Sequence, residues 1–298
     1  MLERHEGLVR IEVDGVPCVA YPGLTGPVAL GDDVVVNAQA RELRLGSGGF
    51  DVLYVNLTRG LGLAPDAGAH VMKLPYTPLQ VAVRHGEEDR EPAASLAGMP
   101  VVCCSLHSQV APVCAALAGA RVAYVQLPGG ALPVALSDSL RELAARGLVD
   151  TTVAADGCLA ADVQCVNVYS ALAWCAAEGF DAVVCSVGPG IVGTGTALGH
   201  GAVAAAIAVN AAQALGGRPV LAPRVSEADP RERHRGLSHH TRTVLELCLA
   251  EPIVPDDLEP AGWREACAGL TLSHMGRGPD EDPAFFAAAY AAGLVTRR

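Results

Sequence analysis

The chain has almost no lysine and few aromatic residues. Among its 298 residues Lys73 is the only lysine, and the aromatic residues Phe, Trp and Tyr make up 4%. A core with so few rings has to be built from small aliphatic side chains, which suits close packing of helices on a sheet. Acidic side chains outnumber basic ones, 32 to 21, and the net charge of −11 repels the phosphate backbone of nucleic acids. We therefore expect no nucleic-acid partner.

The sequence also lacks a long hydrophobic run and a recognisable export segment. Its most apolar stretch, residues 197–217, is rich in alanine and is interrupted by polar residues, which favours a buried helix over a membrane span. Residues 1–10 are rich in charged side chains and lead into no apolar segment. The ten cysteines include no CxxC pair, so reduced thiols are expected rather than a zinc ribbon. These features predict a cytoplasmic protein with no membrane partner.

Two composition patterns divide the chain. Residues 7–86 show short β-rich runs separated by turn residues, which predicts a small β-barrel-like domain over residues 1–90. The charged stretch 87–91, followed by Pro92, is the expected linker. Over residues 91–298 apolar runs alternate with helical stretches, the pattern of a mostly parallel, doubly wound sheet with flanking helices. The predicted fold class is therefore α/β.

Chemically capable residues follow nearly every expected strand of the second domain. His107 and Ser108 come after the first strand, Asp156 after the third, and a glycine-rich loop at 188–196 after the fourth. The opposite ends of the strands offer only glycines that are typical of helix C-caps. Because ligands of doubly wound sheets bind beyond the carboxyl ends of the strands, the sequence predicts a ligand site along that edge.

The glycine-rich loop is the sharpest single motif. Its first glycines follow GxGxxG spacing, but the loop comes after the fourth strand and lacks an acidic residue at the distance of a dinucleotide fingerprint. No lysine precedes its threonines, so it is not a Walker A loop. We expect a generic cradle for a small anionic ligand, and the alternative is a turn that only lets helix and sheet pack closely. The expected ligand-binding residues are Gly188, Gly190, Gly193, Thr194, Gly195, Thr196, Ser108 and Asn167.

Histidines are the main candidates for acid–base chemistry. They are His107, His200, His239 and His240. His107 and one member of the adjacent pair His239–His240 would transfer protons, and Asp156 or Asp138 would orient them. The same imidazoles and carboxylates would alternatively suit a divalent metal ion, although no HExxH spacing supports this, so we assign no metal ligand and leave the cofactor unknown. The structural alternative is that these histidines cap helices or lie on the surface.

Lys73 and an arginine-rich segment complete the candidates. An arginine-biased chain that keeps one lysine indicates a need for a compact ammonium group, and we expect Lys73 to meet substrate charge from the first domain. The alternative is that this single lysine is present by chance and has no function. Arg231, Arg233 and Arg235 surround His234 and are expected to form a solvated loop rather than an anion clamp. The expected catalytic residues are thus His107, His239, His240, Asp156 and Lys73.

Eight blocks of the sequence together resemble a known family. They are residues 45–50 (LGSGGF), 70–80 (HVMKLPYTPLQ), 106–112 (LHSQVAP), 131–138 (ALPVALSD), 166–170 (VNVYS), 187–199, 235–241 (RGLSHHT) and 275–277 (MGR). The family is the bacterial one catalogued as domain of unknown function 3866. The resemblance implies common descent and carries no activity, cofactor or catalytic residue. The matching blocks contain Lys73, His107, Asn167, His239 and His240.

These patterns lead to one functional hypothesis and several rivals. The leading hypothesis is an intracellular enzyme that acts on a small anionic substrate, phosphorylated compounds included, at the carboxyl edge of the sheet. One rival is a non-catalytic ligand-binding or regulatory module that uses the same cradle. Another is a structural homo-oligomer built through apolar helices, and a homo-oligomer is expected in either case. A nucleotide-dependent oxidoreductase is a further alternative.

Overall fold

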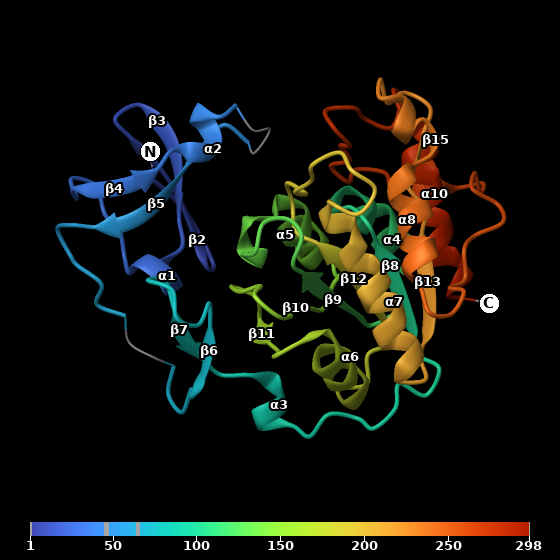
Figure 1. Ribbon diagram of the computed structural model, residues 1–298, viewed down its shortest axis with the longest axis horizontal. Helices are drawn as coiled ribbons and strands as arrows, with labels where there is room; N and C mark the ends of the chain where they lie inside the picture. The colour runs from blue at the N-terminus through green and yellow to red at the C-terminus, as the bar shows by residue number, and fades with distance from the viewer. Residues whose placement is uncertain (1, 45–47, 64–65, 298) are drawn as a thin grey trace. The chain divides into compact units, whose positions relative to one another are not determined.

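The computed structural model (Figure 1) describes residues 2–44, 48–63 and 66–297 of the chain. It divides the chain into two units, Met1–Arg84 and His85–Arg298. Residues 45–47, which begin the LGSGGF block, lie outside the described residues. None of the described helices has both the length and the apolar character that a membrane crossing needs.

The smaller unit is built on one five-stranded sheet. Its strands are β1 Leu2–His5, β2 Leu8–Val13, β3 Val16–Ala20, β4 Val34–Asn37 and β5 Asp51–Asn56. They lie in the order β1–β2–β3–β5–β4, and only the β3–β5 pair is parallel. Asp14 and Gly15 both have positive φ, which the tight turn between β2 and β3 requires. Two single-turn helices, α1 Pro22–Thr25 and α2 Gln39–Glu42, lie in the connections.

The barrel-like closure expected for this domain is not found. In the described part of the unit the sheet is open, with β1 at one edge and β4 at the other. A strand was expected near residues 70–76, but it does not join the five-stranded sheet. It forms β6 Val71–Lys73, which makes a separate two-stranded antiparallel sheet with β7 Val81–Val83. The turn spacing indicated β-structure correctly, but it does not determine which strands become neighbours.

The larger unit contains a six-stranded sheet in which all strands are parallel. The strands are β8 Pro100–Cys104, β9 Val122–Leu127, β10 Thr151–Ala154, β11 Val163–Gln164, β12 Ala182–Val187 and β13 Arg218–Ala222. They lie in the order β11–β10–β9–β12–β8–β13. Every residue of β9 and β12 is buried, as expected for strands covered on both faces. The predicted parallel α/β sheet is confirmed.

Helices cover both faces of this sheet. On one face lie α6 Val168–Ala177 and α7 Ala204–Ala214, and on the other lie α4 Val110–Ala116, α5 Asp138–Ala145 and α10 Pro283–Val295 (Figure 1). Small residues allow close contact: a Cβ added at Gly293 of α10 would lie 2.6 Å from the Ala116 Cβ of α4. The alanine-rich, aromatic-poor composition therefore allows the backbones of neighbouring helices to lie close together.

Three further helices complete the larger unit: α3 Gly86–Asp89, α8 His239–Leu247 and α9 Trp263–Ala266. The stretch expected as a linker, residues 87–91, overlaps α3, and Glu87 Oε1 accepts a 2.7 Å hydrogen bond from the Val166 amide. This stretch is therefore tied into the larger unit.

The strand order decides which loops become neighbours. Because all six strands are parallel, the segments that follow them leave the same edge of the sheet. Both β12 and β13 flank β8, so the loops after β12 and β13 emerge on either side of the loop after β8. Segments separated by tens of residues in the sequence are thereby brought to one place on the carboxyl edge.

Candidate functional site

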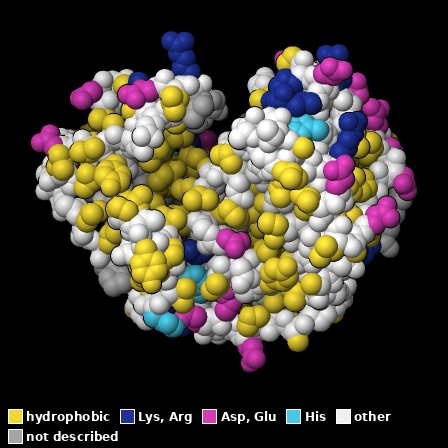
Figure 2. Space-filling model, viewed as in Figure 1, with side chains coloured by type: hydrophobic (Ala, Val, Ile, Leu, Met, Phe, Trp, Pro, Cys, Tyr) yellow, Lys and Arg dark blue, Asp and Glu magenta, His cyan; other side chains and the backbone are white. Residues whose placement is uncertain are grey.

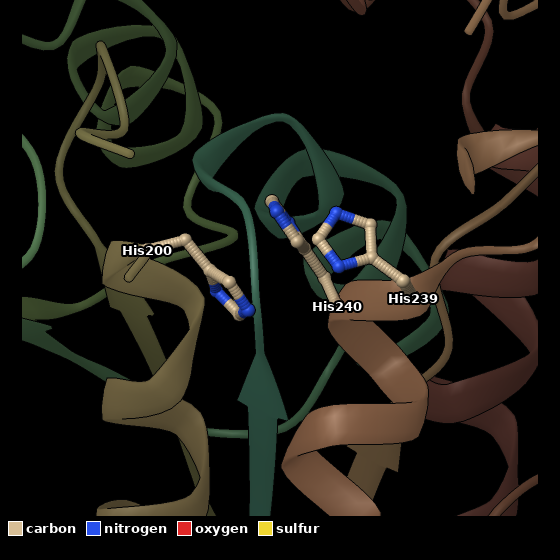
Figure 3. Close-up of side chains that lie close together, drawn as sticks. All are labelled: His200, His239 and His240. Carbon is tan, nitrogen blue, oxygen red and sulfur yellow. The ribbon is translucent and has the colours of Figure 1, made fainter. Parts of the chain in front are cut away.

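Four histidines meet beyond the carboxyl ends of β12 and β13. His200, His234, His239 and His240, called here the histidine cluster, lie with ring centroids 3.9 Å apart for His200–His240, 4.7 Å for His234–His239 and 4.5 Å for His239–His240. His200 precedes a 3-10 helix, Gly201–Val203, that leads into α7, whereas His239 and His240 begin α8. Figure 3 shows His200 facing the other two across the space between these helices. The structure thus brings together three of the four predicted histidines and adds His234.

Short local interactions place the pair on α8. A small ribbon formed by β14 Val225–Ser226 and β15 Gly236–Leu237 folds the chain back, so that the Ser238 amide donates to the Arg224 carbonyl at 2.9 Å. Ser238 is the N-cap of α8, and its Oγ accepts from the His240 amide and lies 2.8 Å from His234 Nδ1. Since the hydroxyl oxygen already accepts, its proton is available for His234 Nδ1. One capping serine therefore orients two members of the cluster.

A buried ion-pair network lies beside the cluster. Asp229 is fully buried, and its carboxylate pairs with Arg224 at 3.2 Å, with Arg231 at 2.8 Å and with Arg277 at 3.6 Å. Burial raises the pKa of Asp229, but the hydrogen bonds from Arg231 outweigh it and hold this pKa well below its usual value. Asp282, also fully buried, accepts from Ser226 Oγ at 2.6 Å. Asp282 also pairs with Arg277 at 3.3 Å, so both buried carboxylates hold arginines in place.

Arg231 corrects one sequence-based expectation. It was expected in a solvated loop, but its guanidinium binds both carboxylate oxygens of Asp229, through Nε at 2.9 Å and Nη2 at 2.8 Å. Arg233 and Arg235 are exposed, in agreement with that expectation. The missed signal was Asp229 itself, two residues before Arg231.

The cluster histidines are uncharged near neutral pH. Burial is the largest cause in each case and lowers the pKa of His240 to about 2 and that of His234 to about 3. Burial also lowers the pKa of His200 and His239, although the Ala197 backbone partly offsets it at His200. Arg224 adds to the effect at His240, since its Nη1 donates to His240 Nδ1 at 3.2 Å. A guanidinium only donates, so the proton of neutral His240 is on Nε2.

The distal part of the glycine-rich loop contacts the cluster. Gly193 forms an isolated antiparallel bridge with His200, and the Ala197 carbonyl accepts from Thr243 Oγ1 of α8 at 3.1 Å. A Cβ placed on Gly195 would lie 3.6 Å from Arg233 Nη2, so this guanidinium reaches the loop. Thr194 and Thr196 are exposed, and their hydroxyls lie 2.9 Å apart. The predicted loop and the predicted pair His239–His240 therefore belong to one region.

The proximal part of the loop is packed against backbone. Gly188 is buried, and a Cβ added there would lie 2.1 Å from the carbonyl oxygen of Ala131. The Ala131 amide donates to the Pro189 carbonyl at 2.8 Å, and the Val192 amide donates to the Gly129 carbonyl at 3.0 Å. Gly190 has φ +69 and open space around its Cα, which indicates a turn. Gly188 thus has a packing role in the structure, whereas Gly193, Gly195 and the threonines are at the exposed end.

His107 and Ser108 lie on the same edge, beyond β8, but have other partners. His107 Nε2 is 2.6 Å from Ser137 Oγ, and His107 Nδ1 is 3.3 Å from the Tyr124 hydroxyl. Burial lowers the pKa of His107 to about 4. Ser108 Oγ is 3.2 Å from Nδ1 of the buried His274. In the described residues no group of three or more His, Cys, Asp or Glu with mutually close ligand atoms includes His107, and the one group found consists of His200, His239 and His240.

The expected aspartates of the larger unit lie outside the cluster. Asp156 is exposed, with φ +52, in the turn after β10, and β9 separates its strand from β12. Asp138, in the first turn of α5, is exposed and pairs with Arg141. Lys73 is 3% exposed and lies in β6 of the smaller unit. The two aspartates are therefore not placed as partners of the cluster histidines.

Asn167 caps a helix. Its Oδ1 accepts from the Ser170 amide at 3.0 Å, at the start of α6. Replacing Asn167 with Ala is expected to lower the free energy of unfolding by about 1 kcal/mol, because a helix amide loses its acceptor. Asn167→Asp keeps the cap and should stay near the wild type. Urea unfolding of both variants measures this. Equal losses in the two variants would contradict the capping role.

Sequence reasoning missed several residues of this region. Arg224 had a usable signal, since it comes two residues after the end of β13 and thus stands at the carboxyl edge. Arg277 lies in the matching block 275–277, whereas His274 and Asp282 had no signal, because they come from an irregular segment before α10 that shows no helical or strand periodicity.

Comparison with known proteins gives one match. A family model described as "Protein of unknown function (DUF3866)" matches residues 17–264, which include the whole histidine cluster. No match was found among curated proteins or among solved structures.

Proposed function

The chain belongs to the DUF3866 family of proteins of unknown function, and we propose that it is an enzyme acting on a small anionic substrate at the carboxyl edge of its parallel sheet. The observation that carries the proposal is the convergence of four histidines with a pKa below the ordinary value beside arginines and an exposed glycine–threonine loop. Neutral imidazoles accept protons, and arginine and loop amides suit an anion.

The local charge supports an anionic substrate. Residues 224–242 contain five arginines and three acidic side chains, so this segment is net positive in a chain of net charge −11. Figure 2 shows histidine atoms at the surface next to a group of basic side chains on the larger unit. Arg224, Arg231 and Arg277 are occupied by Asp229, whereas Arg233 is exposed beside Gly195. Arg233 is therefore the proposed anion-binding side chain, with the 193–196 loop.

The histidines of the cluster are not equally suited to proton transfer. A general base works best when its pKa is near the working pH, so His240, with a pKa of about 2, is too weak. His239 is half-buried, its pKa is lowered mainly by burial, and its Nε2 makes no hydrogen bond within the described residues. We therefore assign proton transfer to His239 and positioning to His240, which Arg224 holds. Phosphorylated compounds are the first substrate class to test.

Arg233→Gln is expected to weaken anion binding about tenfold, because one charge-assisted hydrogen bond is lost. The probes are inorganic phosphate and small phosphorylated or carboxylated metabolites, and the readouts are calorimetric affinity and the shift in melting temperature. Arg235→Gln removes another exposed arginine two residues away and is the matched control, which should bind as the wild type does. Equal weakening in both variants, or no saturable binding of any anion, would contradict the proposal.

A further inference from the structure

One buried histidine of the cluster, His200, has a ring without a hydrogen-bond partner among the described residues. His200 is 8% exposed, and neither of its ring nitrogens makes a hydrogen bond within the described residues. His239 Nε2 is likewise buried and without a partner there. An unsatisfied buried polar atom destabilises the folded state, and His200 carries two. A buried imidazole with both nitrogens open is therefore expected to have a partner that is not part of the chain.

The spacing of the three rings fits a metal ion. One nitrogen each from His200, His239 and His240 can be chosen so that all lie within 4.8 Å of one another. Two nitrogens on one tetrahedral zinc, at about 2.0–2.1 Å each, lie about 3.4 Å apart. The nitrogens therefore have to approach by about 1.4 Å at most, which side-chain rotation can supply.

One ring has to turn for the three lone pairs to meet. The rings of His200 and His240 are stacked with only 20° between their planes, and in that arrangement their in-plane lone pairs do not point at one atom. Arg224 and the neighbouring cap hold His240, whereas no hydrogen bond holds the ring of His200. His200 can therefore turn without breaking a hydrogen bond, whereas His240 has to give up the one from Arg224.

We propose that His200, His239 and His240 bind one divalent transition-metal ion, with zinc as the expected metal. The inference rests on the proposed function only in placing the chemistry at this edge of the sheet, and it replaces the proton-transfer role of His239, because a coordinated nitrogen has no lone pair left to accept a proton. Three imidazoles and no carboxylate or thiolate suit zinc, nickel or copper and do not suit magnesium or calcium. Three neutral ligands leave the ion its full charge and an open position, which would attract a small anion. The metal would therefore strengthen the anion site next to Arg233.

His234 and Arg224 lie at the border of the proposed metal site and are not ligands. His234 Nδ1 is engaged by Ser238, so His234 belongs to the cluster without being a ligand. Arg224 donates to His240 Nδ1, which fixes the proton on Nε2, so coordination by His240 requires this hydrogen bond to be given up. Arg224 then retains its ion pair with Asp229. Bound metal and the Arg224–His240 hydrogen bond therefore exclude each other.

The test uses the full-length chain after treatment with a chelator. Cobalt(II) is titrated in, and the visible absorption of tetrahedral cobalt is followed. The expected result is saturation at one ion per chain, displacement by zinc and no displacement by magnesium. His200→Ala and His239→Gln are each expected to weaken binding more than about 100-fold, beyond the size of an outer-shell effect. Circular dichroism shows whether the variants fold, and His239→Gln changes a half-buried residue and should fold even if His200→Ala does not.

Two control variants separate the site from adventitious binding. His234→Gln, in the cluster but not a ligand, should stay within about tenfold of the wild type. His70→Ala, an exposed histidine of the smaller unit, should leave binding unchanged. No saturable cobalt spectrum, or a spectrum that persists in folded His239→Gln, would overturn the inference. Anion binding with no metal would overturn the metal site alone, and metal binding with no anion would overturn only the proposed substrate class.

Discussion

Lowering the pH from 7 to 5 is expected to reduce the free energy of unfolding by about 4 kcal/mol through two histidines outside the cluster, His107 and His274. Burial is the main cause that lowers the pKa of His107 to about 4 and that of His274 to about 3. Both groups have an ordinary pKa near 6.5 in the unfolded chain. Each contributes about 2 kcal/mol over this range, because only the unfolded chain takes up the proton.

The surroundings of His274 explain why it resists protonation. Its ring is 2% exposed and stacks on Phe285 at 3.7 Å with 2° between the planes. After burial, the charges of Arg224 and Arg277 are the next causes that lower the pKa of His274. A folded-state pKa below the unfolded value means that stability is complete above about pH 6.5 and is lost as the pH falls. The cluster histidines act in the same direction.

Urea unfolding at pH 7, 6 and 5 measures this loss. His274→Gln cannot take up a proton and should remove about 2 kcal/mol of the difference between pH 7 and pH 5. His70→Gln alters an exposed histidine and should leave the pH dependence as in the wild type. An unfolding free energy that stays constant from pH 7 to pH 5 would show that these imidazoles are charged, or solvated, in the folded protein.

The sequence predicted the sheet of the larger unit because parallel strands carry a local signature. Strands such as β9 and β12 are buried on both faces, and they therefore appear as uninterrupted apolar runs between turns. The strand order had no such signature. Strand β12 lies between β8 and β9 because of the way the helical connections cross the sheet. No single residue of the sequence indicates this position. The barrel-like closure failed in the smaller unit for the same reason.

The candidate site was predictable to the extent that it depends on strand ends. The loop after β12 and the histidines that follow β13 were expected at one edge, and Gly193, His200 and the pair His239–His240 do lie together. His107 follows β8, between these two strands, yet its ring is held by Ser137 and Tyr124. Side-chain direction and the partners supplied by the irregular segment near His274 depend on tertiary packing, which the sequence pattern does not contain.

Gly201→Ala is expected to be the most destabilising single methyl group added at this edge. A Cβ at Gly201 would lie 1.9 Å from the carbonyl oxygen of Gly129 and 2.7 Å from its Cα. Both are backbone atoms, so no side-chain rotation relieves the contact. The clash would separate the start of α7 from the loop after β9. We expect the free energy of unfolding to fall by about 3 kcal/mol or more, at or above the upper end of what overpacking usually costs.

Two further glycines lie where the loop after β9 contacts the segment between β12 and α7. A Cβ at Gly130 would lie 2.3 Å from the Gly188 carbonyl oxygen, and one at Gly129, where φ is +135, would lie 2.7 Å from the Gly201 carbonyl oxygen. The glycine-rich loop and the loop after β9 therefore approach backbone to backbone over several residues. This packing explains the proximal glycines of the motif without a ligand. Residues 193–196, at the distal end, therefore remain the candidates for ligand binding.

Urea unfolding of Gly201→Ala beside Gly157→Ala tests this division. Gly157 also lies at the carboxyl edge, but no atom outside its chain neighbours lies within 4 Å of its added Cβ, so this variant should change the free energy of unfolding by no more than about 0.5 kcal/mol. Because Gly201 is adjacent to His200, the same clash should also displace that ring and weaken cobalt binding in whatever fraction of Gly201→Ala folds. A Gly201→Ala protein as stable as Gly157→Ala would mean that the two loops are not in contact, and the placement of His200 opposite α8 would then lose its support.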